Sequence, residues 1–88
     1  MVRLLVRLDR TKYPHRGVKK AEELDKLLKE VKELAERGKI KEAIILLFRW
    51  KPHATIDYLA ERLGVSERTI REAVSRMVAD KEAMLEEI

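Results

Sequence analysis

The sequence contains no cysteine, no asparagine and no glutamine, and it has only three glycines and two prolines among its 88 residues. Without cysteine, the chain can form no disulfide bond, thiolate metal site or cysteine nucleophile. Three scattered glycines make no glycine-rich phosphate loop and no dinucleotide fingerprint. The two histidines, His15 and His53, lack helical ligand spacing, so we expect no metal and no other cofactor. We therefore predict that the chain is not an enzyme.

Long hydrophobic runs are also missing. No stretch of eighteen apolar residues could cross a membrane, and Arg3 and Arg7 interrupt the first apolar stretch, so we expect neither a transmembrane helix nor a secretory signal. A hydrophobic share of 45% argues against intrinsic disorder. A charged share of 41%, together with the absence of asparagine and glutamine, is typical of proteins from very hot environments. We therefore expect one small cytoplasmic domain from a thermophilic prokaryote, or from its virus or plasmid.

Positive charge is concentrated near the N-terminus of a chain whose net charge is +4. Seven of the first twenty residues are lysine or arginine, and Asp9 is the only acid among them. Such a basic segment can bind the phosphates of a polyanion, or it can be a charged edge that prevents aggregation. Its candidate residues are Arg3, Arg7, Arg10, Lys12, Arg16, Lys19 and Lys20.

The first residues alternate in hydropathy. Apolar residues at every second position, two of them β-branched, predict a strand over residues 2–8, with a basic amphipathic helix as the alternative. A single strand leaves backbone groups unpaired, so it needs a partner, either the same strand of a second subunit or the C-terminal residues. Pro14 and Gly17 predict a loop over residues 9–19.

Two helices are expected next. Apolar residues at steps of three and four predict an amphipathic helix from about Lys19, with Gly38 as its C-terminal cap. A second helix is predicted over residues 40–50, and Pro52 ends it. This second helix is apolar over most of its circumference, so we expect it to be the central core element.

Two short helices joined by a turn are predicted over the following residues. Thr55 can cap the first, Gly64 breaks it, and Ser66 can cap the second by accepting a hydrogen bond from a free backbone amide. Val65 before this cap and Ile70 after it have the spacing of a hydrophobic staple.

This stretch, Thr55-Ile-Asp-Tyr-Leu-Ala-Glu-Arg-Leu-Gly-Val-Ser-Glu-Arg-Thr-Ile-Arg-Glu-Ala-Val74, resembles the helix-turn-helix family of bacterial and archaeal DNA-binding regulators. Ala60 stands where two helices cross closely, and Gly64 stands in the turn, where positive φ is usual. The resemblance covers residues 40–79. It implies sequence-specific binding of double-stranded DNA by a small, nucleoid-associated transcription regulator that inserts the helix over residues 66–79 into the major groove.

The resemblance assigns candidate contacts to outward-facing positions. Arginines there can bridge a guanine, and glutamates can accept from a cytosine amine, although an ordinary solvated helix face is the alternative. The candidate base-contacting residues are Ser66, Glu67, Arg68, Arg71, Glu72 and Ser75. Cations before the first short helix can bind phosphate, or they can complement the dipole of the preceding helix. The candidate phosphate-contacting residues are Lys51, His53, Thr55, Thr69 and Arg76.

One departure from the winged members of the family affects the C-terminus. Those members follow the recognition helix with a glycine and a β-hairpin, whereas residues 78–88 contain neither glycine nor proline. Ile70, Val74, Met77, Lys81, Met84 and Ile88 have heptad spacing. We therefore predict that the recognition helix continues to the C-terminus. A terminal strand over residues 83–88, paired with the first strand, is the alternative.

The predicted fold is mainly α with one N-terminal β-strand: an amphipathic helix precedes a three-helix helix-turn-helix core with no clear wing. Residues 1–38 form a dimerisation or arm region, and residues 39–88 form the helix-turn-helix domain with an extended C-terminal helix. We expect a homodimer, because the unpaired strand and the C-terminal heptads both need partners. Its other partner is expected to be double-stranded DNA, and we expect neither a membrane nor a small-molecule ligand. The alternatives are a protein-interaction adaptor with the same core and a non-specific architectural DNA binder.

Overall fold

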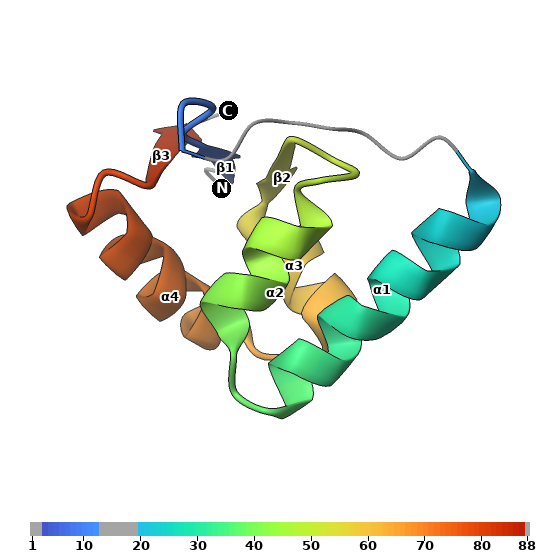
Figure 1. Cartoon of the computed structure of the whole chain (residues 1–88). Coiled ribbons are helices and arrows are strands. Elements are labelled where there is room, and N and C mark those ends of the chain that lie inside the picture. The colour runs from blue at the N-terminus through green and yellow to red at the C-terminus, as the bar shows by residue number, and fades with distance from the viewer. Residues whose placement is uncertain (1–2, 13–19, 88) are drawn as a thin grey trace.

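The computed structural model describes residues 3–12 and 20–87 (Figure 1). Its elements are mostly helical, as predicted, but three strands are present where one was expected. None of the helices in the described part of the chain is long and apolar enough to cross a membrane. The elements, in chain order, are β1 (Leu4–Leu8), α1 (Ala21–Glu36), α2 (Ile40–Leu47), β2 (His53–Thr55), α3 (Ile56–Leu63), α4 (Glu67–Ala79) and β3 (Ala83–Glu87).

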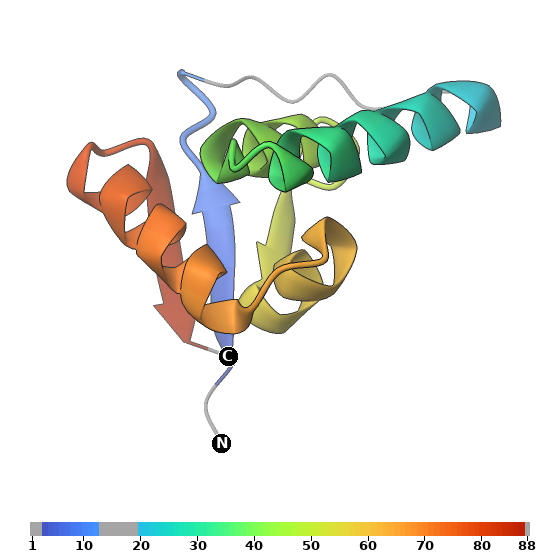
Figure 2. The ribbon, with the colours of Figure 1, turned by 90° about the horizontal axis from the view of Figure 1, so that it is seen from below.

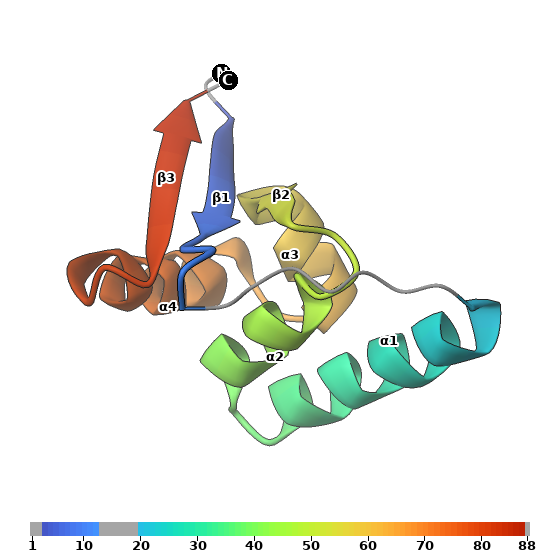
Figure 3. The same cartoon turned by 45° about the horizontal axis from the view of Figure 1, so that its top comes forward.

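The sheet is built around its N-terminal strand. β1 lies between β2 and β3 and is antiparallel to both, so the strand order is β2-β1-β3 (Figure 3). Leu8 is opposite Ala83 and Leu4 is opposite Glu87, so the whole of β1 is paired with β3. The predicted N-terminal strand is therefore confirmed. Of its two predicted partners, this structure contains the C-terminal one.

One hydrophobic core joins the sheet to the helices, which lie on one side of it (Figures 1 and 3). Val6 points from the centre of the sheet into this core and is completely buried. Ile44 and Leu47 of α2 are also completely buried, as expected for the central helix. α1 packs along α2, and its N-terminal end projects past the other helices (Figure 2). The residues of this core come both from the predicted N-terminal region, which ends at Gly38, and from the predicted helix-turn-helix domain that follows it.

The prediction that the recognition helix continues to the C-terminus is wrong. α4 ends at Ala79, and β3 follows after a short turn. The amide of Glu82 donates to the carbonyl of Met77 (2.8 Å) and that of Lys81 to Val78 (3.0 Å), which is the Schellman pattern of a helix end. Lys81 takes the left-handed conformation (φ 58°) that glycine usually occupies there. Because a lysine holds this position, the sequence carries no helix-stop signal.

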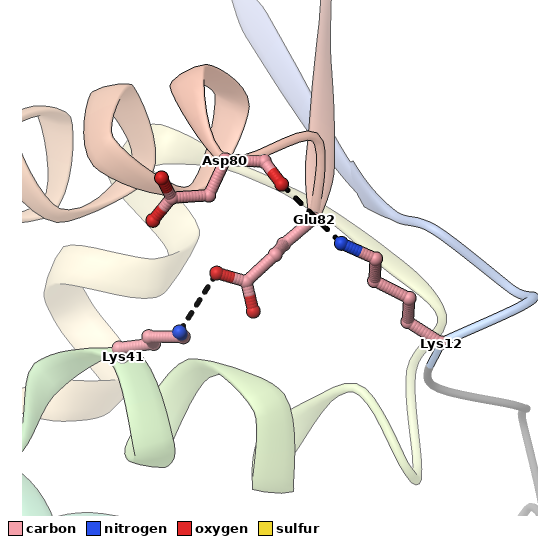
Figure 4. A network of polar contacts seen from close by, with 4 residues as sticks. All are labelled: Lys12, Lys41, Asp80 and Glu82. Atoms are coloured by element: carbon pink, nitrogen blue, oxygen red, sulfur yellow. Dashed lines mark hydrogen bonds and ion pairs between the residues drawn. The ribbon is translucent and has the colours of Figure 1, made fainter.

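The turn after α4 is fastened to two other parts of the fold (Figure 4). Lys41 of α2 places its Nζ 2.7 Å from Oε1 of Glu82, whose side chain is only 10% exposed. The backbone amide of Asp9 donates to the carbonyl of Glu82 (2.8 Å), and Nζ of Lys12 donates to the carbonyl of Asp80 (3.3 Å). These contacts hold the start of β3 against the end of β1, next to the first residue pair of the two strands.

The second predicted helix is shorter than expected. α2 ends at Leu47, and the amides of both Trp50 and Lys51 donate to the carbonyl of Leu47. The chain then forms β2, which places Ala54 opposite Val6. This strand is only three residues long, too short for its alternation to be recognised in the sequence.

We predict that Val6→Ala lowers the free energy of unfolding by about 2 kcal/mol, because it leaves a cavity under the central strand. Leu5→Ala is the matched control. It removes more carbon atoms, but Leu5 is only half-buried, so the loss should be smaller. Urea denaturation followed by circular dichroism measures both variants. Equal losses would contradict the placement of Val6 in the core.

Lys81→Gly should raise the free energy of unfolding by ~0.5–1 kcal/mol, because glycine adopts positive φ without the strain of a side chain. Gly64→Ala should do the opposite and lower it by ~1 kcal/mol, because Gly64 has φ 71°. Thermal and urea unfolding of the pair checks both signs. A loss of stability in Lys81→Gly would show that the turn does not need the left-handed conformation.

Candidate nucleic-acid interface

The turn between α3 and α4 has the geometry that the motif predicts. Gly64 adopts positive φ (71°), and the amides of Gly64 and Val65 both donate to the carbonyl of Ala60 (2.9 and 3.1 Å). Ser66 caps α4, since its Oγ accepts from the Thr69 amide (3.2 Å). The predictions for the turn glycine and the serine cap are confirmed. The turn and the cap fix the direction in which α4 leaves α3.

The start of α3 carries a carboxylate beside its capping residue. Oγ1 of Thr55 accepts from the Tyr58 amide (3.4 Å), which confirms the predicted cap. The Thr55 hydroxyl also hydrogen-bonds the carboxylate of Asp57 and lowers its pKa, and Arg3 lowers it further. Asp57 therefore remains ionised and already supplies the negative charge that a helix N-terminus favours. This occupancy weakens the case for Thr55 as a phosphate contact.

The outward face of α4 brings all six candidate base-contacting residues together. Ile70, Val74 and Met77 are buried on the opposite side, so the helix is held by its apolar stripe while its polar face is left open. Every member of the polar face is exposed: Ser66, Glu67, Arg68, Arg71, Glu72 and Ser75.

The charges on this face are not equivalent. Nε of Arg68 lies 3.4 Å from Oε1 of Glu72, one helical turn later, and both side chains are largely exposed (88% and 67%). Among the described residues, Arg71 forms no ion pair, so its five donors are available to a partner. Glu67 and Glu72 balance the two arginines. The face is therefore suited to directional hydrogen bonding more than to general attraction of a polyanion.

The candidate phosphate-contacting residues do not form one group. Nζ of Lys51 lies 4.0 Å from the ring centre of Tyr58. His53 is exposed and stands opposite Arg7 in the sheet, at the first position of β2. The hydroxyl of Thr69 shares a hydrogen bond with Ser66 (2.9 Å). Only Arg76 is both exposed and on α4, in its last turn.

A cluster of aromatic and cationic side chains from α3 and from the turn after α2 was missed in the sequence. Nε of Arg62 donates to the hydroxyl of Tyr58 (3.1 Å), and its guanidinium lies 5.5 Å from the ring centre of Tyr58 and 5.9 Å from that of Trp50. Lys51 approaches the same tyrosine, so two cations share one aromatic residue. The spacing of Tyr58 and Arg62, four residues apart on one helix, was the available signal.

The basic N-terminal segment is dispersed over the structure. Nε of Arg7 forms an ion pair with Oε2 of Glu86 in the neighbouring strand (3.3 Å), and Lys12 contacts the turn after α4. Arg3, Arg10 and Lys20 are exposed. Two further members of the segment, Arg16 and Lys19, lie outside the described residues. Two of the described members are therefore used to build the sheet and its turn.

The comparisons with known proteins identify the middle and C-terminal part of the chain. Residues 39–80 match the profile of a family described as the HTH domain. No curated protein and no solved structure matches the chain. The matched segment covers α2, α3 and α4, the elements whose caps, turn and buried stripe are described above. Residues 39–80 are therefore a helix-turn-helix domain, a class of domain that supports DNA binding.

Proposed function

We propose that the protein is a small transcription regulator that binds double-stranded DNA sequence-specifically by placing α4 in the major groove. The observation that carries this proposal is the polar face of α4. Six candidate contact residues are exposed together there, on a helix fixed by a capped turn and a buried stripe. A helix presented in this way can bring its first turns to the base edges.

Arg71 is the residue that we expect to read a base most directly. Its guanidinium is exposed and unpaired among the described residues, so it can bridge O6 and N7 of a guanine without first breaking an ion pair. Arg68 would have to leave Glu72, or bring it along as an acceptor for a neighbouring cytosine amine. The remaining contacts would go to phosphate, with Arg76 the best-placed cation on α4.

We propose further that the protein acts as a homodimer on a site of matching symmetry. One domain offers one copy of α4, a helix of 13 residues, and the charges near its contact face are balanced. A second copy doubles the number of base contacts and places them in successive grooves. The composition remains the basis for expecting a thermophilic source, and the helix-turn-helix domain is the basis for proposing a role at the nucleoid.

Arg71→Ala should reduce the difference in affinity between a selected duplex and random DNA, by ~1–3 kcal/mol at one base pair. If Lys51 contacts phosphate, Lys51→Ala should weaken binding to both duplexes to a similar extent. It should also reduce the dependence of the affinity on salt concentration. Lys29→Ala, an exposed change on α1, is the control and should change neither. The measurement is a salt titration of binding to both duplexes by fluorescence anisotropy.

A protein-interaction adaptor is the second candidate function, and the charge balance on α4 favours it. Two glutamates on a polar face of six residues disfavour approach to phosphate, whereas a protein partner tolerates them. The same titration separates the two functions. If the unmutated protein binds neither duplex at low salt, α4 does not serve DNA and the adaptor function takes precedence.

A further inference from the structure

β3 is an edge strand with one side unpaired among the described residues (Figure 3). Its hydrogen-bonding pattern can be worked out from the turn that precedes it. The bond from Asp9 to Glu82 makes those two residues a hydrogen-bonded pair, and such pairs alternate along an antiparallel ladder. Met84 and Glu86 therefore direct their backbone groups toward β1. The backbone groups of the three intervening residues, Ala83, Leu85 and Glu87, point outward.

The apolar surface of the described residues is concentrated beside this edge. Three large hydrophobic side chains are exposed: Val78 (36%), Met84 (55%) and Leu85 (38%). All three line the same open cleft of about 930 Å³, which reaches from the end of α4 across β3. An edge strand with free backbone groups and exposed apolar side chains is a template for pairing with another strand.

We propose that β3 is the dimerisation edge and pairs antiparallel with β3 of a second copy, with Leu85 opposite Leu85. This proposal names the interface of the homodimer in the proposed function. Antiparallel pairing of identical strands is isologous, so the same contacts occur twice and the assembly closes at two chains. The two sheets of three strands become one continuous sheet, and neither copy keeps a free β3 edge.

The proposed register is the one that the backbone and the charges favour. With Leu85 opposite itself, the outward-pointing backbone groups of Ala83, Leu85 and Glu87 all find partners across the axis. Met84 is then opposite Glu86, and Ala83 is opposite Glu87. No acid faces an acid, although two of the five residues of the strand are glutamates. Glu87 of one copy also comes near the segment that contains the exposed Lys81 of the other.

A proline substitution tests this register, because proline removes one backbone donor. Leu85→Pro removes an outward-pointing amide and leaves the bonds of Met84 and Glu86 to β1 in place. Leu85→Lys is the second variant, since it keeps every backbone bond and places two cations opposite each other. Both should remain folded by circular dichroism and should raise the dissociation constant of the dimer by roughly tenfold or more, measured by sedimentation equilibrium.

Met84→Lys distinguishes a register from non-specific hydrophobic association. Met84 is the most exposed of the three apolar side chains, so its replacement would weaken non-specific hydrophobic association. In the proposed register the new lysine faces Glu86 of the other copy, so association should be unchanged or tighter. A clear weakening by Met84→Lys, or unchanged association in both Leu85 variants, would overturn the proposal.

Amide hydrogen exchange of the unmutated protein gives an independent measurement. At high concentration the amides of Leu85 and Glu87 should become protected, while those of Met84 and Glu86 are already protected in the monomer. A protein that remains monomeric up to millimolar concentration would also overturn the proposal. All of these measurements are made without DNA. Failure of the dimer interface can therefore be distinguished from failure of α4 to bind DNA.

Discussion

The pairing of β1 with strands on both of its sides is the constraint on which the rest of the structure depends. A central strand must have its backbone groups satisfied along both edges, and here its partners come from distant parts of the chain. β2 lies between α2 and α3, and β3 directly follows α4. Through β1, both ends of the pair of helices α3 and α4 are therefore held in place. The ion pair between Lys41 of α2 and Glu82 also holds the turn after α4.

This constraint matters for the polar face of α4. The buried stripe of α4 and the fixed ends of the helix together set the direction in which its polar side chains point. The Ser66 cap and the Gly64 turn fix the first end, and the Schellman turn at Lys81 fixes the second. The remaining freedom lies in the exposed side chains, where Arg68 can exchange Glu72 for another partner. Under the proposed function, selectivity would therefore come from a few exposed side chains on a helix that is held at both ends.

The predictable parts of the fold are those whose signals are local. Gly64 in its turn and the caps at Thr55 and Ser66 each act within a few residues, so the helix-turn-helix segment could be identified from the sequence. The helix end at Lys81 could not, because lysine does not signal a left-handed turn, and the contacts that hold this turn, such as the ion pair between Lys41 and Glu82, come from distant parts of the chain. The heptad spacing of apolar residues extends beyond Ala79, so this spacing gave no sign that α4 ends there.

The candidate site shows the same division. The exposure of the α4 face followed from the apolar stripe opposite it, since period and burial are linked. The position of His53 did not, because it depends on β2 pairing with the N-terminal strand. The cluster of Trp50, Tyr58 and Arg62 depends on the turn after α2, which brings Trp50 back toward α3. Both positions depend on contacts between different elements, which no local sequence pattern indicates.

The position of β1 also has a consequence for the order of folding. During synthesis this strand is made first, and β3, the partner that pairs along its full length, is made last. The helices between them pack through contacts of much shorter sequence separation, which form faster. We therefore expect the helices to pack around α2 while β1 is still unpaired. The sheet should form in the final step. Until then, β1, the most apolar of the three described strands, is exposed to pairing with the wrong chain.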